Sequence, residues 1–190
     1  MSKSDLTKQA LASAFKKLVA TKPYDQVTIS EICALCGLNR KSFYYHFKDK
    51  YDLGEWIFQT ECVDTTQVST DDADETLWEV LRHICTYLYN ERDFYTKLLN
   101  DATANGGFYQ YLFEMLCEFF DDYINAYSQP ISQAEHKPRH FYVQMLSDAV
   151  LAAICRWLID DGAATTPEEF VEQVKSMATY AEGLNKNPST

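Results

Sequence analysis

Apolar side chains recur at steps of three and four residues along almost the whole chain, and this spacing constrains the fold more than any other feature. Between Ser4 and Lys22, for example, Leu11, Phe15 and Leu18 fall on one face of a helix that Ser4 is expected to cap. Later segments repeat this spacing between Gly, Pro, Asn or Asp residues, and none alternates apolar and polar residues as a strand does. Hydrophobic residues make up 46% of the 190 residues, enough to bury a core. The sequence therefore predicts an all-α fold of about nine helices.

The N-terminal third contains two short helices joined by a tight turn. Thr28 or Ser30 is expected to cap the first of them, because either hydroxyl can accept a hydrogen bond from a free N–H group at a helix start. Gly37 is expected to end that helix in the left-handed conformation, and Asn39 is expected to cap the next one. Two short helices joined by such a turn predict a helix-turn-helix.

The second helix of this pair, Arg40 to Phe47, has one apolar face and one polar face. Phe43 and Phe47 stand four residues apart and are expected to anchor it. The side chains expected to face outward are Arg40, Lys41, Tyr44, Tyr45 and His46. Cations at a helix start and phenols along its side suit the major groove of DNA, where guanine presents acceptors and phosphates accept from hydroxyls.

Lys48 and Lys50 flank the start of the following helix, which Asp49 is expected to cap. Free backbone N–H groups at a helix start attract phosphate, and the two lysines would strengthen that attraction. We therefore expect a phosphate-binding site at this helix start.

Charge is divided unevenly between the two ends of the chain. Residues 1–52 hold nine lysines and arginines against five acidic residues, whereas residues 53–190 hold eight against twenty-three. The net charge of -11 therefore conceals a basic N-terminal segment followed by an acidic body. Such asymmetry is typical of a polyanion-binding module joined to a regulatory domain, although surface lysines alone could also produce it.

The segment VTISEICALCGLNRKSFYYHFKDKYDL resembles the DNA-binding segment of the TetR/AcrR family of bacterial transcription regulators, over about the first third of the chain. The matching features are Thr28, Ile32, Gly37, Phe43-Tyr44-Tyr45-His46-Phe47, Lys50 and Leu53 at the family's spacing. The resemblance implies an all-helical homodimer whose two heads read a palindrome in double-stranded DNA, in successive major grooves about 34 Å apart. It also implies a helix-turn-helix domain at residues 1–50 and an effector-binding, dimerising helical bundle at residues 51–190.

The resemblance further implies roles for single residues. Phosphate contacts are implied for Thr28, Tyr44, His46 and Lys50, and contacts to bases for positions 39–42. Together with the outward-facing side chains, the candidate DNA-binding set is Thr28, Asn39, Arg40, Lys41, Ser42, Tyr44, Tyr45, His46, Lys48 and Lys50. Many relatives have glycine where Lys41 stands, and a long cation there would enlarge the footprint or shift the preferred bases.

Family resemblance places the dimer interface on the last two long helices, expected at about residues 139–161 and 167–184. The candidate interface residues are Phe141, Met145, Ala149, Ala152, Ala153, Leu158, Phe170 and Val174. Small residues among them would let two helices approach closely, although packing within one chain would use the same residues.

Aromatic residues are dense between Trp56 and Tyr142, as expected of a cavity for an apolar or aromatic effector or, equally, of ordinary core packing. The candidate pocket residues are Trp56, Trp78, Tyr87, Phe94, Tyr95, Tyr109, Phe113 and Met145.

The mode of regulation stays open at this point. Repression is the family's common mode. However, the C-terminal segment CRWLIDDGAATTPEEFVEQV resembles a branch from Gram-positive bacteria that includes the activator of dihydroxyacetone kinase operons. That resemblance implies a second hypothesis, an activator controlled by a protein co-regulator rather than by a small molecule.

Other classes of function have weaker support. Motifs of hydrolases, phosphate-binding loops, zinc proteases and dinucleotide sites are absent, so we expect no enzyme and no cofactor. Cys33 and Cys36 form a C-x-x-C that is expected to be core, with a thiol-based redox sensor as the alternative. His136, His140 and the acidic run 71–74 are weak metal candidates. The chain begins without a signal peptide, and its longest apolar run, residues 149–155, is short for a membrane span, so a cytoplasmic protein is expected.

Overall fold

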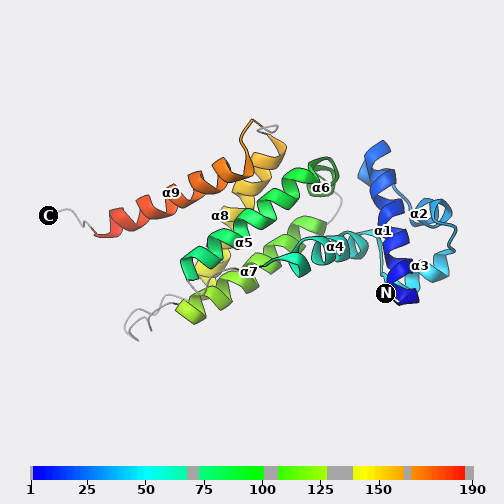
Figure 1. The fold of residues 1–190 in the computed structure, drawn as a ribbon, viewed down its shortest axis with the longest axis horizontal. Coiled ribbons are helices and arrows are strands. Elements are labelled where there is room, and N and C mark those ends of the chain that lie inside the picture. Colours follow the sequence, from blue (N-terminus) through cyan, green and yellow to red (C-terminus); the bar gives the residue numbers. More distant parts are fainter. Residues whose placement is uncertain (1, 68–72, 101–106, 128–138, 161–163, 187–190) are drawn as a thin grey trace. The chain divides into compact units, whose positions relative to one another are not determined.

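Helices make up nearly all of the part of the chain that the computed structural model describes, namely residues 2–67, 73–100, 107–127, 139–160 and 164–186 (Figure 1). The α-helices are α1 (Lys3–Thr21), α2 (Ile29–Leu35), α3 (Arg40–His46), α4 (Lys50–Glu61), α5 (Ala73–Asn90), α6 (Arg92–Leu99), α7 (Gly107–Tyr127), α8 (Arg139–Ile159) and α9 (Pro167–Lys186). Two short 3-10 helices, η1 (Tyr24–Gln26) and η2 (Val63–Thr65), follow α1 and α4. The described residues contain no strand, and the predicted all-α fold is confirmed.

The helix starts show why these segments begin where they do. Thr28, rather than Ser30, caps α2, because Glu31 stands three residues later and its carboxylate accepts from the backbone N–H of Thr28 at 3.0 Å. The expected cap of α1 is wrong by two residues. Ser2 caps α1 instead of Ser4, since Asp5 completes the same reciprocal pair with Ser2.

The described helices pack into two compact units. Unit 1 comprises Met1–Thr65 and Glu91–Glu118, and unit 2 comprises Thr66–Asn90 and Phe119–Thr190. The division into two units follows from which residues pack together and not from function. The expected functional boundary between residues 50 and 51 stays a prediction.

Unit 1 has an aromatic core built on α1, α4, α6 and the first part of α7. Phe15 contacts Phe94 edge-on at 5.6 Å between ring centroids, and Tyr95 stacks on Phe108 at 5.0 Å. Phe58 of α4 meets the edge of Tyr95 at 5.7 Å. These rings are buried, and ring pairs of this geometry contribute beyond the area that they bury.

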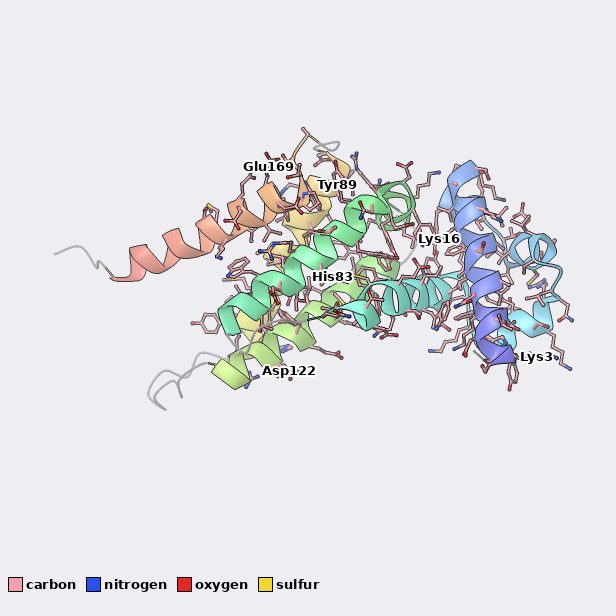
Figure 2. The ribbon with its side chains drawn as sticks, viewed as in Figure 1. Lys3, Lys16, His83, Tyr89, Asp122 and Glu169 are labelled. Atoms are coloured by element: carbon pink, nitrogen blue, oxygen red, sulfur yellow. The ribbon has the colours of Figure 1, made fainter. Side chains whose placement is uncertain are left out.

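Lysines of unit 1 add polar ties between elements distant in sequence. Lys16 on α1, labelled in Figure 2, pairs with Glu61 at 2.5 Å and with Glu91 at 3.2 Å. Lys97 of α6 donates to the carbonyl of Val19 at 2.5 Å, at the end of α1. A cation at a helix C-terminus satisfies free carbonyls and favours the helix dipole.

Unit 2 is held by a stack of three aromatic rings. Trp157 of α8 lies between Tyr89 of α5, at 5.9 Å, and Phe170 of α9, at 4.6 Å, with interplanar angles of 16° and 13°. The indole N–H of Trp157 donates to the carbonyl of Thr165 at 3.0 Å, which ties α8 to the connection before α9. The three helices are therefore joined by one buried tryptophan.

Among the described residues, α8 is the one helix whose length and composition would let it cross a membrane. Its mean hydropathy is 1.3 over 18 residues. The uninterrupted apolar run 149–155 is much shorter than this helix, because Asp148 and Arg156 interrupt it. The run alone therefore did not predict a helix of membrane-spanning length. Core helices of soluble proteins can have the same length and composition; α8 buries Val143, Leu151 and Ile154, and 33% of its apolar window is buried.

Candidate nucleic-acid interface

The turn between α2 and α3 is set by backbone hydrogen bonds around Gly37. Gly37 adopts φ +69°, a conformation that other residues rarely adopt. The N–H of Leu38 donates to the carbonyl of Cys33 at 2.9 Å, and that of Gly37 donates to Ala34 at 3.3 Å. This pair of bonds is a Schellman motif, and it ends α2 as the sequence predicts.

Helix α3 is anchored on one face and capped at its start. Phe43 is fully buried and Phe47 nearly so, and their rings contact each other at 5.8 Å. The side-chain oxygen of Asn39 accepts from the backbone N–H of Ser42 at 2.8 Å and from the Ser42 hydroxyl at 3.2 Å. The predicted anchors and the predicted cap are therefore confirmed.

The opposite face of α3 is exposed and carries cations and phenols. Arg40 and Lys41 are exposed, Tyr44 is 49% exposed and Tyr45 is 82% exposed. One guanidinium nitrogen of Arg40 donates to the hydroxyl of Tyr44 at 3.2 Å, and this hydrogen bond raises the pKa of Arg40 above its ordinary value. Tyr44 thus holds the Arg40 guanidinium along the exposed side of the helix. His46 is half-buried, against the ring of Tyr45 at 4.9 Å.

Thr28 lies exposed at the start of α2, with its hydroxyl committed to Glu31. The hydroxyl donates to the Glu31 carboxylate at 2.6 Å, and Lys22 pairs with the same carboxylate at 2.6 Å. Hydrogen bonds from Lys22 and then Thr28 lower the pKa of Glu31 to about 2. A carboxylate therefore stands beside this predicted phosphate contact, and Lys22 offsets its charge.

The start of α4 differs from the expectation. The carboxylate of Asp49 accepts from the N–H groups of Tyr51 and Asp52 at 2.8 and 2.9 Å, and Asp52 accepts from the N–H of Lys48 at 2.8 Å. The prediction that these N–H groups are free for phosphate is wrong, because two carboxylates of the chain already occupy them.

The two lysines at this helix start have different surroundings. The side chain of Lys48 is exposed. The half-buried ammonium of Lys50 donates to the carbonyl of Tyr24 at 2.7 Å and lies 4.2 Å from the centroid of the Tyr24 ring. No local pattern in the sequence signals this contact, since its partners are 26 residues apart.

The candidate pocket residues are divided between the two units. Trp56 contacts Phe47, Phe94 and Tyr95 belong to the core of unit 1, and Trp78 lies under Lys175 in unit 2. The half-buried or exposed members are Trp56, Trp78, Tyr87, Tyr109, Phe113 and Met145. The candidate pocket stays a prediction.

The candidate interface residues divide by exposure. Phe141 and Met145 are 57% and 52% exposed, and Ala149 is exposed on the same side of α8. Ala152, Ala153 and Val174 are half-buried, whereas Leu158 and Phe170 are buried within unit 2. The exposed members stand at steps of four residues, which forms an apolar stripe along α8.

The weaker candidates are also placed in part. Cys33 is buried, and burial raises the pKa of its thiol, which disfavours the reactive thiolate that a redox sensor needs. The half-buried thiol of Cys36 donates to the carbonyl of Ile32 at 3.2 Å. Within the described ranges no group of three metal-ligating side chains was found; His136, Asp71 and Asp72 lie outside them.

Two family models match the chain. Residues 75–180 match the model described as a transcriptional regulator C-terminal region, and residues 11–55 match the model of bacterial regulatory proteins of the tetR family. The first match alone spans more than half of the chain.

Individual relatives agree with these models. A 99-residue stretch is 31% identical to the HTH-type dhaKLM operon transcriptional activator DhaS of Lactococcus lactis subsp. lactis strain IL1403, over 52% of this chain and 51% of that protein. The matched stretch thus spans about half the length of that curated relative. The solved structure of a dihydroxyacetone kinase operon activator DhaS is similar with a TM-score of 0.61 and 21% identity, over 92% of this chain and 95% of that one. A TetR-family regulator from Syntrophomonas wolfei str. Goettingen has a TM-score of 0.68 and 20% identity, over 91% and 93%.

Proposed function

Because the chain belongs to the TetR family of bacterial regulatory proteins, we propose that it binds a palindromic DNA operator as a homodimer and that an effector modulates this binding. As a family member it is a DNA-binding transcriptional regulator and not an enzyme. One observation carries the proposal: buried Phe43 and Phe47 anchor α3 so that its cationic and phenolic face stays open to solvent. The protein acts in the cytoplasm, where its DNA is.

Contacts to DNA divide into two kinds on this surface. Arg40 and Lys41, at the exposed start of α3, read base edges in the major groove. The hydroxyls of Tyr44 and Tyr45, together with His46 and the exposed Lys48, contact phosphates. Thr28 joins them only by releasing its hydrogen bond to Glu31. Asn39 and Ser42 hold each other at the helix start, and they set the orientation of the residues between them.

The apolar stripe on α8 supports the homodimer. Phe141 and Met145 leave large apolar side chains in water, and Ala149 a small one, unless a second surface covers them. A second copy of the same stripe provides that surface around a twofold axis, as closed homodimers do. Leu158 and Phe170 are buried within unit 2 and do not face the partner.

The effector is a small apolar or aromatic molecule or a protein co-regulator. The half-buried and exposed aromatic residues among the candidate pocket set support the small molecule, since such rings can line a site for an apolar ligand. Repression is the mode of regulation that we propose first, through a bound dimer that blocks transcription.

Activation is a second candidate, because the curated relative with 31% identity over 99 residues is an operon activator. The similarity supports this mode over half of the chain. An activator of this kind would act with a protein co-regulator.

Selection of bound duplexes from a random pool tests the proposal. Enriched duplexes are expected to hold two inverted half-sites whose centres lie about 10 base pairs, or a multiple, apart. Arg40→Ala/Lys41→Ala is expected to change the enriched bases, whereas Lys17→Ala, an exposed lysine of α1, removes charge and should leave them unchanged. Enrichment of no sequence, or an identical preference in the double variant, would contradict the assignment of α3.

The sign of regulation needs a separate measurement. The selected duplex is placed at a promoter, and transcription is measured with protein alone and with cell extract added. Repression lowers transcription with protein alone. Activation raises it only when the extract supplies the co-regulator.

A further inference from the structure

We propose that Lys50 is a positioning residue that holds the start of α4 on the backbone carbonyls before α2, and that it does not contact phosphate. The resemblance to the family implies the opposite role for this lysine. The inference rests on the proposed DNA binding only where the salt dependence of binding is compared between Lys50 and Lys48 variants.

The surroundings of the Lys50 ammonium match its three N–H donors. Its nitrogen lies 2.7 Å from the carbonyl oxygen of Tyr24 and 3.4 Å from each of the carbonyl oxygens of Asp25 and Val27. An ammonium has three donors and no acceptor, so one short and two longer contacts to carbonyls direct its donors toward the backbone. A phosphate would have to displace them.

Aromatic rings enclose the same ammonium. The centroid of the Tyr24 ring is 4.2 Å away and that of Tyr51 is 5.7 Å away. Tyr24 is itself only 4% exposed, so its ring is a fixed part of the unit 1 core. A cation over a buried ring is attracted by the negative face of the ring, and this attraction adds to the carbonyl contacts.

The carbonyls that Lys50 holds belong to the segment that leads into α2. Tyr24–Gln26 form η1, Val27 follows it, and Thr28 comes next as the cap of α2. α2 in turn leads through the Gly37 turn into α3. Lys50 therefore ties the start of α4 to the base of the helix-turn-helix.

The rest of the α4 start also disfavours a phosphate. Asp49 and Asp52 occupy backbone N–H groups there and place two carboxylates at the helix start. Like charges at this distance oppose the approach of a phosphate. At the start of α4, the side chain of Lys48 is exposed to solvent, in contrast to the half-buried side chain of Lys50.

Paired variants separate the two roles, because a lost phosphate contact and a lost positioning contact change different quantities. A plot of log affinity against log salt concentration has a negative slope. Lys48→Met is expected to make this slope less steep by about 0.9, as loss of one phosphate contact does. Lys50→Met is expected to leave that slope unchanged, to lower the thermal midpoint by about 2–4 °C and to weaken operator binding. Hydrogen exchange of the amides at 26–32 should speed up by about 10-fold in Lys50→Met and stay unchanged in Lys48→Met.

Lys50→Arg covers the case in which Lys50→Met does not fold. Arginine keeps the charge, but its planar fork does not match three carbonyls converging on one point. Lys50→Arg is thus expected to show a lower thermal midpoint and faster exchange at 26–32, with an unchanged salt slope. A reduced slope in Lys50→Met, or a midpoint and exchange identical to the native protein in either variant, would overturn the proposal.

The positioning role and the DNA-binding proposal fail separately. The thermal midpoint and the exchange rates test Lys50 without DNA. Absence of operator binding by the native protein, with the expected midpoint and exchange changes, would refute the DNA-binding proposal and leave the positioning role supported.

Discussion

The exposed faces of α3 in unit 1 and of α8 in unit 2 differ in chemistry, and the difference separates two kinds of surface. In unit 1 the helix α3 exposes Tyr44 and Tyr45, whose hydroxyls can donate to phosphate, beside Arg40 and Lys41. In unit 2 the helix α8 exposes Phe141 and Met145, whose side chains have no strong hydrogen-bonding group. The first surface suits a polyanion, and the second suits another apolar protein surface.

The units also differ in how their helices are joined. In unit 1, Lys16, Lys50 and Lys97 reach carboxylates or backbone carbonyls far along the chain. In unit 2, the described ring stack through Trp157 joins α5, α8 and α9. Unit 1 therefore adds lysine contacts between distant segments to its ring packing, whereas α5, α8 and α9 of unit 2 meet at one ring stack.

The largest expected effect tests whether the open face of α3 depends on its buried anchor. Phe43→Ala removes a fully buried ring and is expected to cost about 3–5 kcal/mol in the free energy of unfolding. Tyr45→Ala, at an 82% exposed site of the same helix, is expected to change stability by less than about 0.5 kcal/mol and to weaken DNA binding. Chemical denaturation and a binding titration measure the two quantities. Equal losses of stability in both variants would show that α3 is not anchored as described.

The next effect tests the apolar stripe of unit 2. Met145→Asp places a charge in each copy of the proposed interface, and burying unpaired charge costs about 3 kcal/mol or more. The dissociation constant of the dimer is therefore expected to rise by at least about 100-fold. Analytical ultracentrifugation measures it.

Gln110→Asp is the matched control for Met145→Asp, since it adds the same charge at an exposed site of α7 in unit 1. It is expected to leave the dimer intact. Dissociation in both variants would point to net charge rather than the stripe, and dissociation in neither would move the interface away from Met145.

What the sequence predicted about these surfaces depended on the distance between partners. The cap Asn39, the α2 cap at Thr28 or Ser30 and the turn at Gly37 were predictable, because their partners lie within five residues. The anchors Phe43 and Phe47 were predictable from helical spacing for the same reason.

Contacts between distant segments were not predictable in this way. The carbonyl partners of Lys50 lie more than 20 residues away in the sequence. The residues next to Lys50 therefore do not distinguish it from an exposed lysine. The stripe on α8 shows a related limit. The family resemblance grouped Leu158 with Met145 as interface candidates, but the packing of unit 2 buries Leu158 and leaves Met145 exposed.

A smaller effect tests how far the position of α3 depends on the backbone of one turn residue. A Cβ at Gly37 would meet no atom within 4 Å, so Gly37→Ala adds no clash and isolates the cost of φ +69°. We expect a loss of about 1 kcal/mol in the free energy of unfolding, with weaker DNA binding. Gly37→Asn is the matched variant, because asparagine tolerates the left-handed conformation, and it is expected to lose less. Equal losses in both variants would show that the turn relaxes out of this conformation.

The smallest effect compares two helix caps of the same design, one in each unit. Glu31 of α2 and Glu169 of α9 each accept from the backbone N–H of a capping threonine, Thr28 or Thr166. Hydrogen bonds from Lys22 and then Thr28 lower the pKa of Glu31, and those from Thr166 lower the pKa of Glu169. Glu31 has Lys22 as an additional partner, and its pKa falls to about 2 from an ordinary value of 4.5.

A carboxyl whose pKa is lower in the folded protein stabilises the fold above its unfolded pKa and loses that contribution as pH falls toward its folded pKa. The thermal midpoint of the native protein minus that of Glu31→Gln is therefore expected to shrink between pH 4.5 and about 2, where a protonated carboxyl resembles the amide. The same difference for Glu169→Gln is expected to be smaller at neutral pH, because no lysine pair adds to its cap. Circular dichroism measures the thermal midpoints of the native protein and of both variants across this pH range and at neutral pH. A difference that stays constant with pH would show that the charge of Glu31 contributes nothing to folding, and that Lys22 is paired with it without stabilising unit 1.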